Sequence, residues 1–184
     1  MEPVRVHVDI ESYSELDLTK VGLYRYAMHP STRIELVSWG VGDEPVRTWD
    51  ATDGTPFPED LLALLHDDTT HWYAFNAPFE RIMIACVWKI TIPADRWHCT
   101  MVHVWMLGFS GGLADVGTQM GIATDKQKMA HGKKLVLKFC KPAPKNHKVD
   151  RYDRHNSPVE WAEYTEYNLS LIHISEPTRQ PATS

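Results

Sequence analysis

The alternation of residues 4–11 constrains the fold of this chain more than any other sequence feature. Apolar and polar residues alternate there in the order Val4, Arg5, Val6, His7, Val8, Asp9, Ile10 and Glu11. Because side chains on a β-strand point alternately to opposite faces, this period of two predicts a strand that is buried on one side. The same geometry places the carboxylates of Asp9 and Glu11 on one face, about 7 Å apart along the strand.

The rest of the pattern predicts an α/β domain. Further strands are expected at 34–41, 46–49 and 72–75, and helices at 58–65, 100–107, 113–120, 125–139 and 157–168. The clearest helix begins after Asn76, which is a suitable N-cap, and it carries an apolar stripe that starts at Phe79. Strands that precede helices, with strand–helix alternation in the middle of the chain, predict one three-layer domain in which helices flank a central sheet.

Charge is distributed unevenly along the chain. The formal net charge is −5, yet ten of the 19 lysines and arginines lie between residues 125 and 154, where only three aspartates oppose them. Such a segment attracts phosphate, and the acidic remainder of the chain is available to hold cations. A solvated helix and loop rich in lysine would have the same composition, and that alternative stays open on charge alone.

Membrane proteins and disulfide-rich proteins are the classes that composition disfavours. No apolar run approaches the roughly 18 residues of a membrane span. Cys86, Cys99 and Cys140 are widely spaced and form no C-x-x-C pair. That spacing disfavours a disulfide framework and a structural zinc site, and a reducing cytoplasm is the expected location.

Asp9 and Glu11 are candidate metal ligands. Two carboxylates this close repel each other unless a cation or a proton lies between them, and Mg²⁺ favours oxygen ligands of this kind. Two ions about 4 Å apart would stabilise both the attacking and the leaving oxygen of phosphodiester cleavage. The alternative is a chance occurrence of two acidic residues on the solvent face of a strand.

A second acidic element strengthens the metal-site interpretation. Glu80 follows Asn76 in the first turn of the predicted helix, at a strand-to-helix junction where the sites of α/β proteins gather. A purely structural role is also open, because Asn76 would cap the helix and Glu80 would interact favourably with the helix dipole.

Three segments together resemble the signature of the DEDD exonuclease superfamily. They are Asp9-Ile10-Glu11-Ser12-Tyr13-Ser14-Glu15, then Asn76-Ala77-Pro78-Phe79-Glu80, and finally Tyr167 near the end of the last helix. The chain is most similar to the tyrosine-type 3′→5′ exonuclease domain of phage-type family A DNA polymerases, from about residue 4 to residue 168. The resemblance implies a ribonuclease H-like fold with a central mixed sheet, a polymerase domain in the parent protein, and the cytoplasm of a bacterium or a phage-infected host cell.

The resemblance also implies a role for each candidate residue. Asp9 would bridge two Mg²⁺ or Mn²⁺ ions, Glu11 would hold the ion that activates water, and Glu80 would hold the other ion. Tyr167 would orient the attacking water in a proofreading-type hydrolysis at the 3′ end of single-stranded DNA. The candidate contacts to the nucleic acid are Ser12, Asn76, Lys141 and Lys145. Many relatives have Thr in place of Ser12 and Asp in place of Glu80, so Glu80 would reach one methylene further.

The chain departs from the family pattern after residue 168. The family has Asp four residues after the tyrosine, one helical turn away on the same face, whereas this chain has Leu171. The string from Leu169 onwards resembles the in-frame translation of a transposon-end sequencing adapter, and a genuine short tail is the alternative. We therefore expect an exonuclease domain at 1–168 that is incomplete at its C-terminus, and a non-native or disordered tail at 169–184. Loss of that carboxylate predicts poor ion binding and slow or absent cleavage.

Two other functions stay open on the sequence. An RNA 3′→5′ exonuclease of the same superfamily would use the same residues. A catalytically inactive module would clamp a single strand without cutting it, and the missing carboxylate favours that function for this chain.

Overall fold

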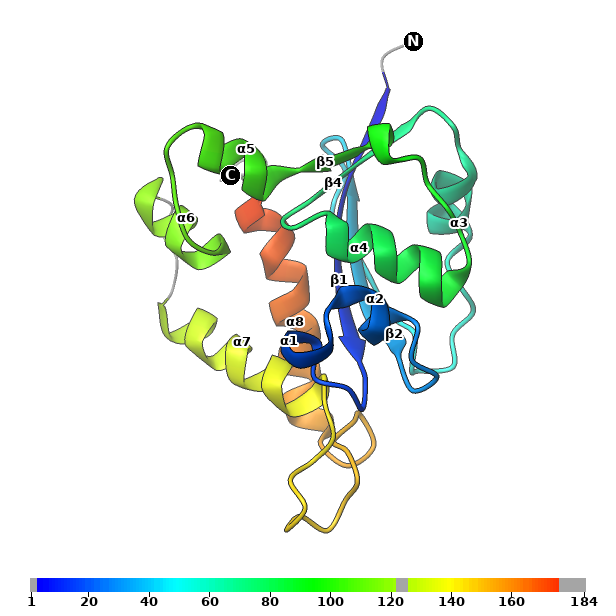
Figure 1. The fold of residues 1–184 in the computed structure, drawn as a ribbon, viewed down its shortest axis with the longest axis vertical. Helices are drawn as coiled ribbons and strands as arrows, with labels where there is room; N and C mark the ends of the chain where they lie inside the picture. The colour runs from blue at the N-terminus through cyan, green and yellow to red at the C-terminus, as the bar shows by residue number, and fades with distance from the viewer. Residues whose placement is uncertain (1–2, 122–125, 176–184) are drawn as a thin grey trace.

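A five-stranded mixed sheet forms the centre of the computed structural model, which describes residues 3–121 and 126–175 (Figure 1). The strands are β1 (Val4–Tyr13), β2 (Arg33–Val41), β3 (Arg47–Asp50), β4 (Thr70–Ala74) and β5 (Trp97–Cys99). They lie in the order β3-β2-β1-β4-β5. β2 is antiparallel to β1 and β3, whereas β4 is parallel to β1 and β5. These directions confirm the predicted α/β class and mixed sheet, in the strand order of a ribonuclease H-like fold.

Helices fill the connections between the strands. They are α1 (Leu18–Val21), α2 (Leu23–Ala27), α3 (Glu59–His66), α4 (Pro78–Met83), α5 (Thr100–Met106), α6 (Leu113–Gln119), α7 (Lys126–Phe139) and α8 (Pro158–Ser175). α4 continues as a π-helical turn over Ile84–Trp88, and a 3₁₀ turn at Ala94–Arg96 leads into β5. The sequence pattern does not predict α1, α2 or β5, because such short elements show no measurable period. Within the described ranges, no helix has the length and apolarity needed to cross a bilayer.

Neighbouring residues of the central strands are buried in two different cores. Val8 and Val37 belong to a core that also contains Met83 of α4. Leu36, next to Val37 on β2, belongs to a second core with Tyr164 of α8. Because successive strand residues point to opposite faces, α4 and α8 cover opposite sides of the sheet. The three predicted layers are therefore present.

The last helix is longer than the sequence predicts. It was expected to end at about Asn168, but α8 continues to Ser175. Ile172 is fully buried, and Leu171 packs against the second core. The helix end predicted at Asn168 is therefore wrong, because apolar side chains that bury themselves keep adding turns to an existing helix. Residues 176–184 lie outside the described residues, and the non-native origin of the tail stays a prediction.

The predicted helix cap at Asn76 is wrong. Ala77 is the N-cap of α4, and no side chain hydrogen-bonds to the helix there. Asn76 instead has a left-handed backbone with a φ of 77°, and its carbonyl accepts a hydrogen bond from Phe79 N at 2.8 Å. Asparagine adopts this conformation more readily than most residues, so a tight turn accounts for its position. That turn carries the chain directly from β4 into α4.

Candidate active site

Asp9 and Glu11 lie on the face of β1 that α8 covers. Their partners across the antiparallel pair are Ser38 and Leu36 of β2. The pairing register shifts directly after Glu11, between Glu11 and Ser12. Irregularities of this kind bend a strand locally and are frequent beside active sites.

Helix α8 supplies one hydrogen-bond donor to each of these carboxylates. Asn168 Nδ2 donates to Asp9 Oδ2 at 2.6 Å, and Asn168 Oδ1 accepts from Ser38 Oγ at 2.5 Å. Tyr164 OH donates to Glu11 Oε2 at 3.0 Å. Tyr164 and Asn168 are four residues apart and so share one face of the helix. The sequence interpretation gave neither residue a role, although two polar side chains at this spacing within a buried helix were an available signal.

Glu80 joins the two carboxylates of β1 from the first turn of α4. Its side chain is 3% exposed, and its Oε2 has no hydrogen-bond partner within the described part of the chain. Burial, followed by the negative charge of Asp9, raises the pKa of Glu80 well above its usual range, and Glu11 adds to the rise. Glu80 thus lies near enough to Asp9 and Glu11 to feel their charge, although it belongs to a different element of the fold.

Burial raises the pKa values of the other two carboxylates as well. The pKa of Asp9 rises to about 7, against the opposing effect of the hydrogen bond from Asn168. The pKa of Glu11 rises to about 8, through burial and then the charge of Asp9, while the Tyr164 hydrogen bond acts in the other direction. Carboxylates that are withdrawn from water and repel one another are stable only when protons or a cation offset their charge.

The chemistry of this cluster fits a divalent cation. Hard cations such as Mg²⁺ bind carboxylate oxygens, and no donor among the described residues reaches the buried Oε2 of Glu80. Over residues 3–121 and 126–175, however, no three His, Cys, Asp or Glu side chains are grouped closely enough to hold one ion. Asn168 and Tyr164 each occupy one carboxylate oxygen. The oxygen donors therefore suit a divalent cation, but their spacing in this structure does not form a three-ligand site among the described residues.

Tyr167 lies beside the same cluster. It is 7% exposed, and burial followed by the charges of Glu11 and Asp9 raises its pKa to about 12. Its ring packs directly on Gly132 of α7, where an added Cβ would lie 2.1 Å from Tyr167 Cδ2. Only a residue without a side chain allows this approach. Gly132 is thus a determinant of the site that the sequence pattern did not reveal.

Replacing Gly132 by Ala tests this contact. We expect the variant to lose about 1–3 kcal/mol of unfolding free energy, because the added methyl must displace the Tyr167 ring. This loss should exceed the gain of about 1 kcal/mol in helix propensity. Urea denaturation measures the net change in unfolding free energy. In a Tyr167→Ala background the same change is expected to be neutral or stabilising, and an equal loss in both backgrounds would disprove the contact.

The candidate nucleic-acid contacts lie in different surroundings. Ser12 is 4% exposed, and its hydroxyl shares a hydrogen bond with Tyr26 OH at 3.0 Å. Asn76 forms the turn before α4. Lys141 and Lys145 are exposed in the segment that follows α7. The structure therefore does not bring these four residues together as one group.

A cavity of about 560 Å³ opens beside Glu11. Phe79 and Leu137 line it with apolar surface, Ser12 lies near the carboxylate, and Lys141 supplies a cation. Apolar walls with a few polar groups are typical of sites for small molecules or for single units of a polymer. The cavity therefore combines apolar walls with charged groups directly beside Glu11.

No protein-family model matches the chain. A DNA polymerase of Bacillus phage SP02 is 31% identical to it over 170 residues, which cover 91% of this chain and 26% of the polymerase. The chain thus spans about a quarter of the length of that relative. Among solved structures, an apo form of a nuclease is 13% identical to this chain, with a TM-score of 0.41. The alignment covers 94% of this chain and 72% of the nuclease chain. NrnC of Brucella melitensis is also 13% identical, with a TM-score of 0.39, and the alignment covers 96% of this chain and 76% of the NrnC chain. Structural likeness this remote does not bear on function.

Proposed function

We propose that the chain is a proofreading-type 3′→5′ exonuclease domain of the tyrosine-type DEDD superfamily, which hydrolyses single-stranded DNA from its 3′ end. The observation that carries the proposal is the electrostatic proximity of Asp9, Glu11 and Glu80, of which Glu11 and Glu80 are buried. The similarity to a phage DNA polymerase supports it. The chain matches only 26% of that polymerase, so the similarity does not establish what the parent protein contains. A polymerase domain in the parent protein, and a location in the cytoplasm of a bacterium or a phage-infected cell, therefore belong to the proposal.

In this proposal the carboxylates of Asp9, Glu11 and Glu80 would bind the metal ions, and hydrogen bonds from α8 would orient two of these carboxylates. Two Mg²⁺ or Mn²⁺ ions would lower the pKa of water and offset the charge that develops on the phosphate. Asp9 would bind both ions, Glu11 the ion on the water side, and Glu80 the other. Asn168 and Tyr164 would orient the carboxylates of Asp9 and Glu11 through the hydrogen bonds described above, since such supporting bonds commonly tune metal ligands.

The surrounding residues would position the strand and the attacking water. The pKa of about 12 keeps the Tyr167 hydroxyl protonated at neutral pH, so it would hold a water molecule as a hydrogen-bond donor. The cavity beside Glu11 would receive the terminal nucleoside, with Phe79 and Leu137 against the base. Lys141 at the same cavity would attract the strand's phosphates.

A catalytically inactive single-strand-binding module is the second candidate. Leu171 takes the position where the superfamily has its last carboxylate, and it packs against the second core. The absence of a three-ligand group over the described ranges also favours this candidate. An RNA 3′→5′ exonuclease would be the same chemistry on another substrate, and parallel assays with DNA and RNA of one sequence distinguish these two enzymes.

The test of the proposal is Mg²⁺-dependent shortening of a 5′-labelled single strand. We expect slow or absent cleavage by the 184-residue chain, faster cleavage by Leu171→Asp, and none by Asp9→Asn. Leu171→Asn is the matched control, because it changes polarity and size without adding a carboxylate. The products should form a ladder that shortens from the 3′ end.

Each deviation from this pattern has a distinct meaning. Shortening from the 5′ end would reject the proposed polarity. Robust cleavage by the unaltered chain would contradict its predicted impairment. Strand binding with no cleavage by any variant would favour the inactive module.

A further inference from the structure

A second cavity, of about 750 Å³, lies between α7 and the loop that follows it. We call it the α7 groove. The basic and aromatic side chains that line it are Lys134, Lys138, Lys141, His147 and Tyr152. No Asp or Glu of the described residues lines it. The α7 groove is therefore a positively charged hollow with apolar walls.

Two lysines of the α7 groove, Lys134 and Lys141, are available to bind an anion. Lys134 and Lys141 are exposed, and neither forms an ion pair with a residue in the described ranges. Lys138 differs, since it pairs with Glu160 and lies 4.4 Å from the centre of the Tyr152 ring. Cations without such partners are the ones best able to bind an anionic ligand.

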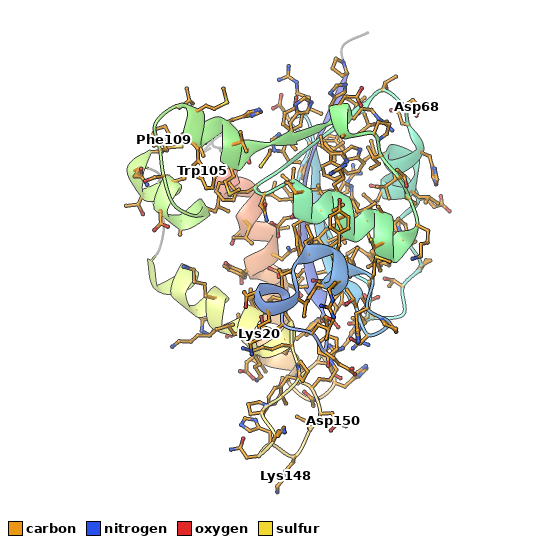
Figure 2. All side chains as sticks on the ribbon, in the orientation of Figure 1. Lys20, Asp68, Trp105, Phe109, Lys148 and Asp150 are labelled. Carbon is orange, nitrogen blue, oxygen red and sulfur yellow. The ribbon has the colours of Figure 1, made fainter. Side chains whose placement is uncertain are left out.

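The loop wall of the groove is tied to the rest of the domain. Arg151 Nη2 donates to the buried Glu35 Oε1 at 2.6 Å, and its guanidinium lies 4.2 Å from the Tyr13 ring centre. Within the loop, Ala143 N donates to Asp150 O at 2.8 Å. Figure 2 shows Asp150 and Lys148 toward the far end of this loop, away from the sheet. The groove is thus built on anchored backbone, which suits a binding surface.

The α7 groove is continuous with the cavity beside Glu11. Leu137, Lys141 and Pro142 line both of them. A polymer whose end lies next to the acidic cluster would therefore pass Lys141 and continue along α7 towards Lys134. An isolated small ligand would need only one of the two cavities.

We propose that the α7 groove binds the phosphodiester backbone of the nucleotides that precede the 3′-terminal one. The position of the 3′ end beside Glu11 rests on the proposed function, whereas the charge and shape of the groove do not. Lysine contacts to backbone phosphates are independent of base sequence and sensitive to salt. The chain accordingly binds single strands that fill both cavities more tightly than dinucleotides, which fill only the first.

Binding without cleavage tests this inference. Fluorescence anisotropy of 5′-fluorescein oligothymidylates, from two to ten nucleotides long, is measured in EDTA so that no hydrolysis occurs. We expect affinity to rise with length, and Lys134→Ala to weaken the ten-nucleotide strand but not the dinucleotide. Loss of one phosphate contact should also reduce the slope of log affinity against log salt by about 0.7 for a single strand.

Lys148→Ala is the matched control, because it also removes one exposed lysine, from the loop that borders the groove but not from the groove's lining. The inference fails if Lys148→Ala and Lys134→Ala weaken the long strand equally, or if Lys134→Ala weakens the dinucleotide as much as the long strand. Oligouridylates should respond as the DNA strands do, and a response confined to one sugar would contradict backbone recognition. Length-dependent binding that needs Lys134, together with no cleavage by any variant, would favour the inactive module over the exonuclease and leave the groove assignment intact.

Discussion

Mn²⁺ at about 100 times its dissociation constant is expected to stabilise this chain by about 2.7 kcal/mol, and Asp9→Asn is expected to abolish that stabilisation. A cation that binds the folded state alone relieves the repulsion among Asp9, Glu11 and Glu80, whose pKa values are all raised by burial. Asp9 is the residue proposed to contact both ions. Thermal unfolding followed by circular dichroism, with Mn²⁺ titrated against EDTA, measures the effect.

The three acidic residues should not respond equally to neutralisation. Glu80→Gln should lose the Mn²⁺ stabilisation along with Asp9→Asn, because both would hold the same ion. Glu11→Gln should retain most of it, since the ion assigned to Glu11 also needs the carboxylate that Leu171 replaces. Undiminished stabilisation of Asp9→Asn by Mn²⁺ would contradict the proposed metal site, and a complete loss in Glu11→Gln would contradict the division of ligands.

Glu35→Ala is expected to lower the free energy of unfolding by about 3–5 kcal/mol, the usual cost of removing one partner of a buried ion pair. Glu35 is fully buried on β2, and its Oε1 accepts from Arg33 Nε at 2.9 Å and from Arg151 Nη2 at 2.6 Å. Arg33 is 49% exposed and regains water readily, whereas Arg151 is 16% exposed and accounts for more of the loss. A loss of this size lowers the melting temperature by roughly 10 °C in a domain of this length.

The measurement is best made at pH 8, where Glu35 is ionised even though burial raises its pKa to about 7. Glu35→Gln is the matched control, because it keeps the shape and one hydrogen-bond acceptor and should recover part of the loss. Since Arg151 anchors the loop of the α7 groove, Glu35→Ala should also weaken binding of the ten-nucleotide strand. A destabilisation below about 1 kcal/mol would show that the arginines find equivalent partners elsewhere.

Local periodicity was sufficient for the long elements and failed for the short ones. The alternation that begins at Val4 predicts β1, and the stripe that begins at Phe79 predicts α4 together with the π-helical turn that continues it, because each pattern spans several repeats. β5 has three residues, and it exists because Trp97 pairs with Trp72 of β4 in a parallel ladder. A segment that short carries too little pattern to be identified from its own residues. The sequence also does not separate a helix cap from a left-handed turn at Asn76, since both favour the same residue types.

The amino-acid order alone determined that Asp9 and Glu11 share a face, because the two-residue repeat of an extended strand leaves no other arrangement. Tertiary structure alone decided what meets them there. Asn168 reaches Asp9 across 159 positions of the chain, and Gly132 admits the Tyr167 ring. Those contacts depend on how separate helices pack onto the sheet, and packing is set by the combined shape of distant side chains, which no local repeat records.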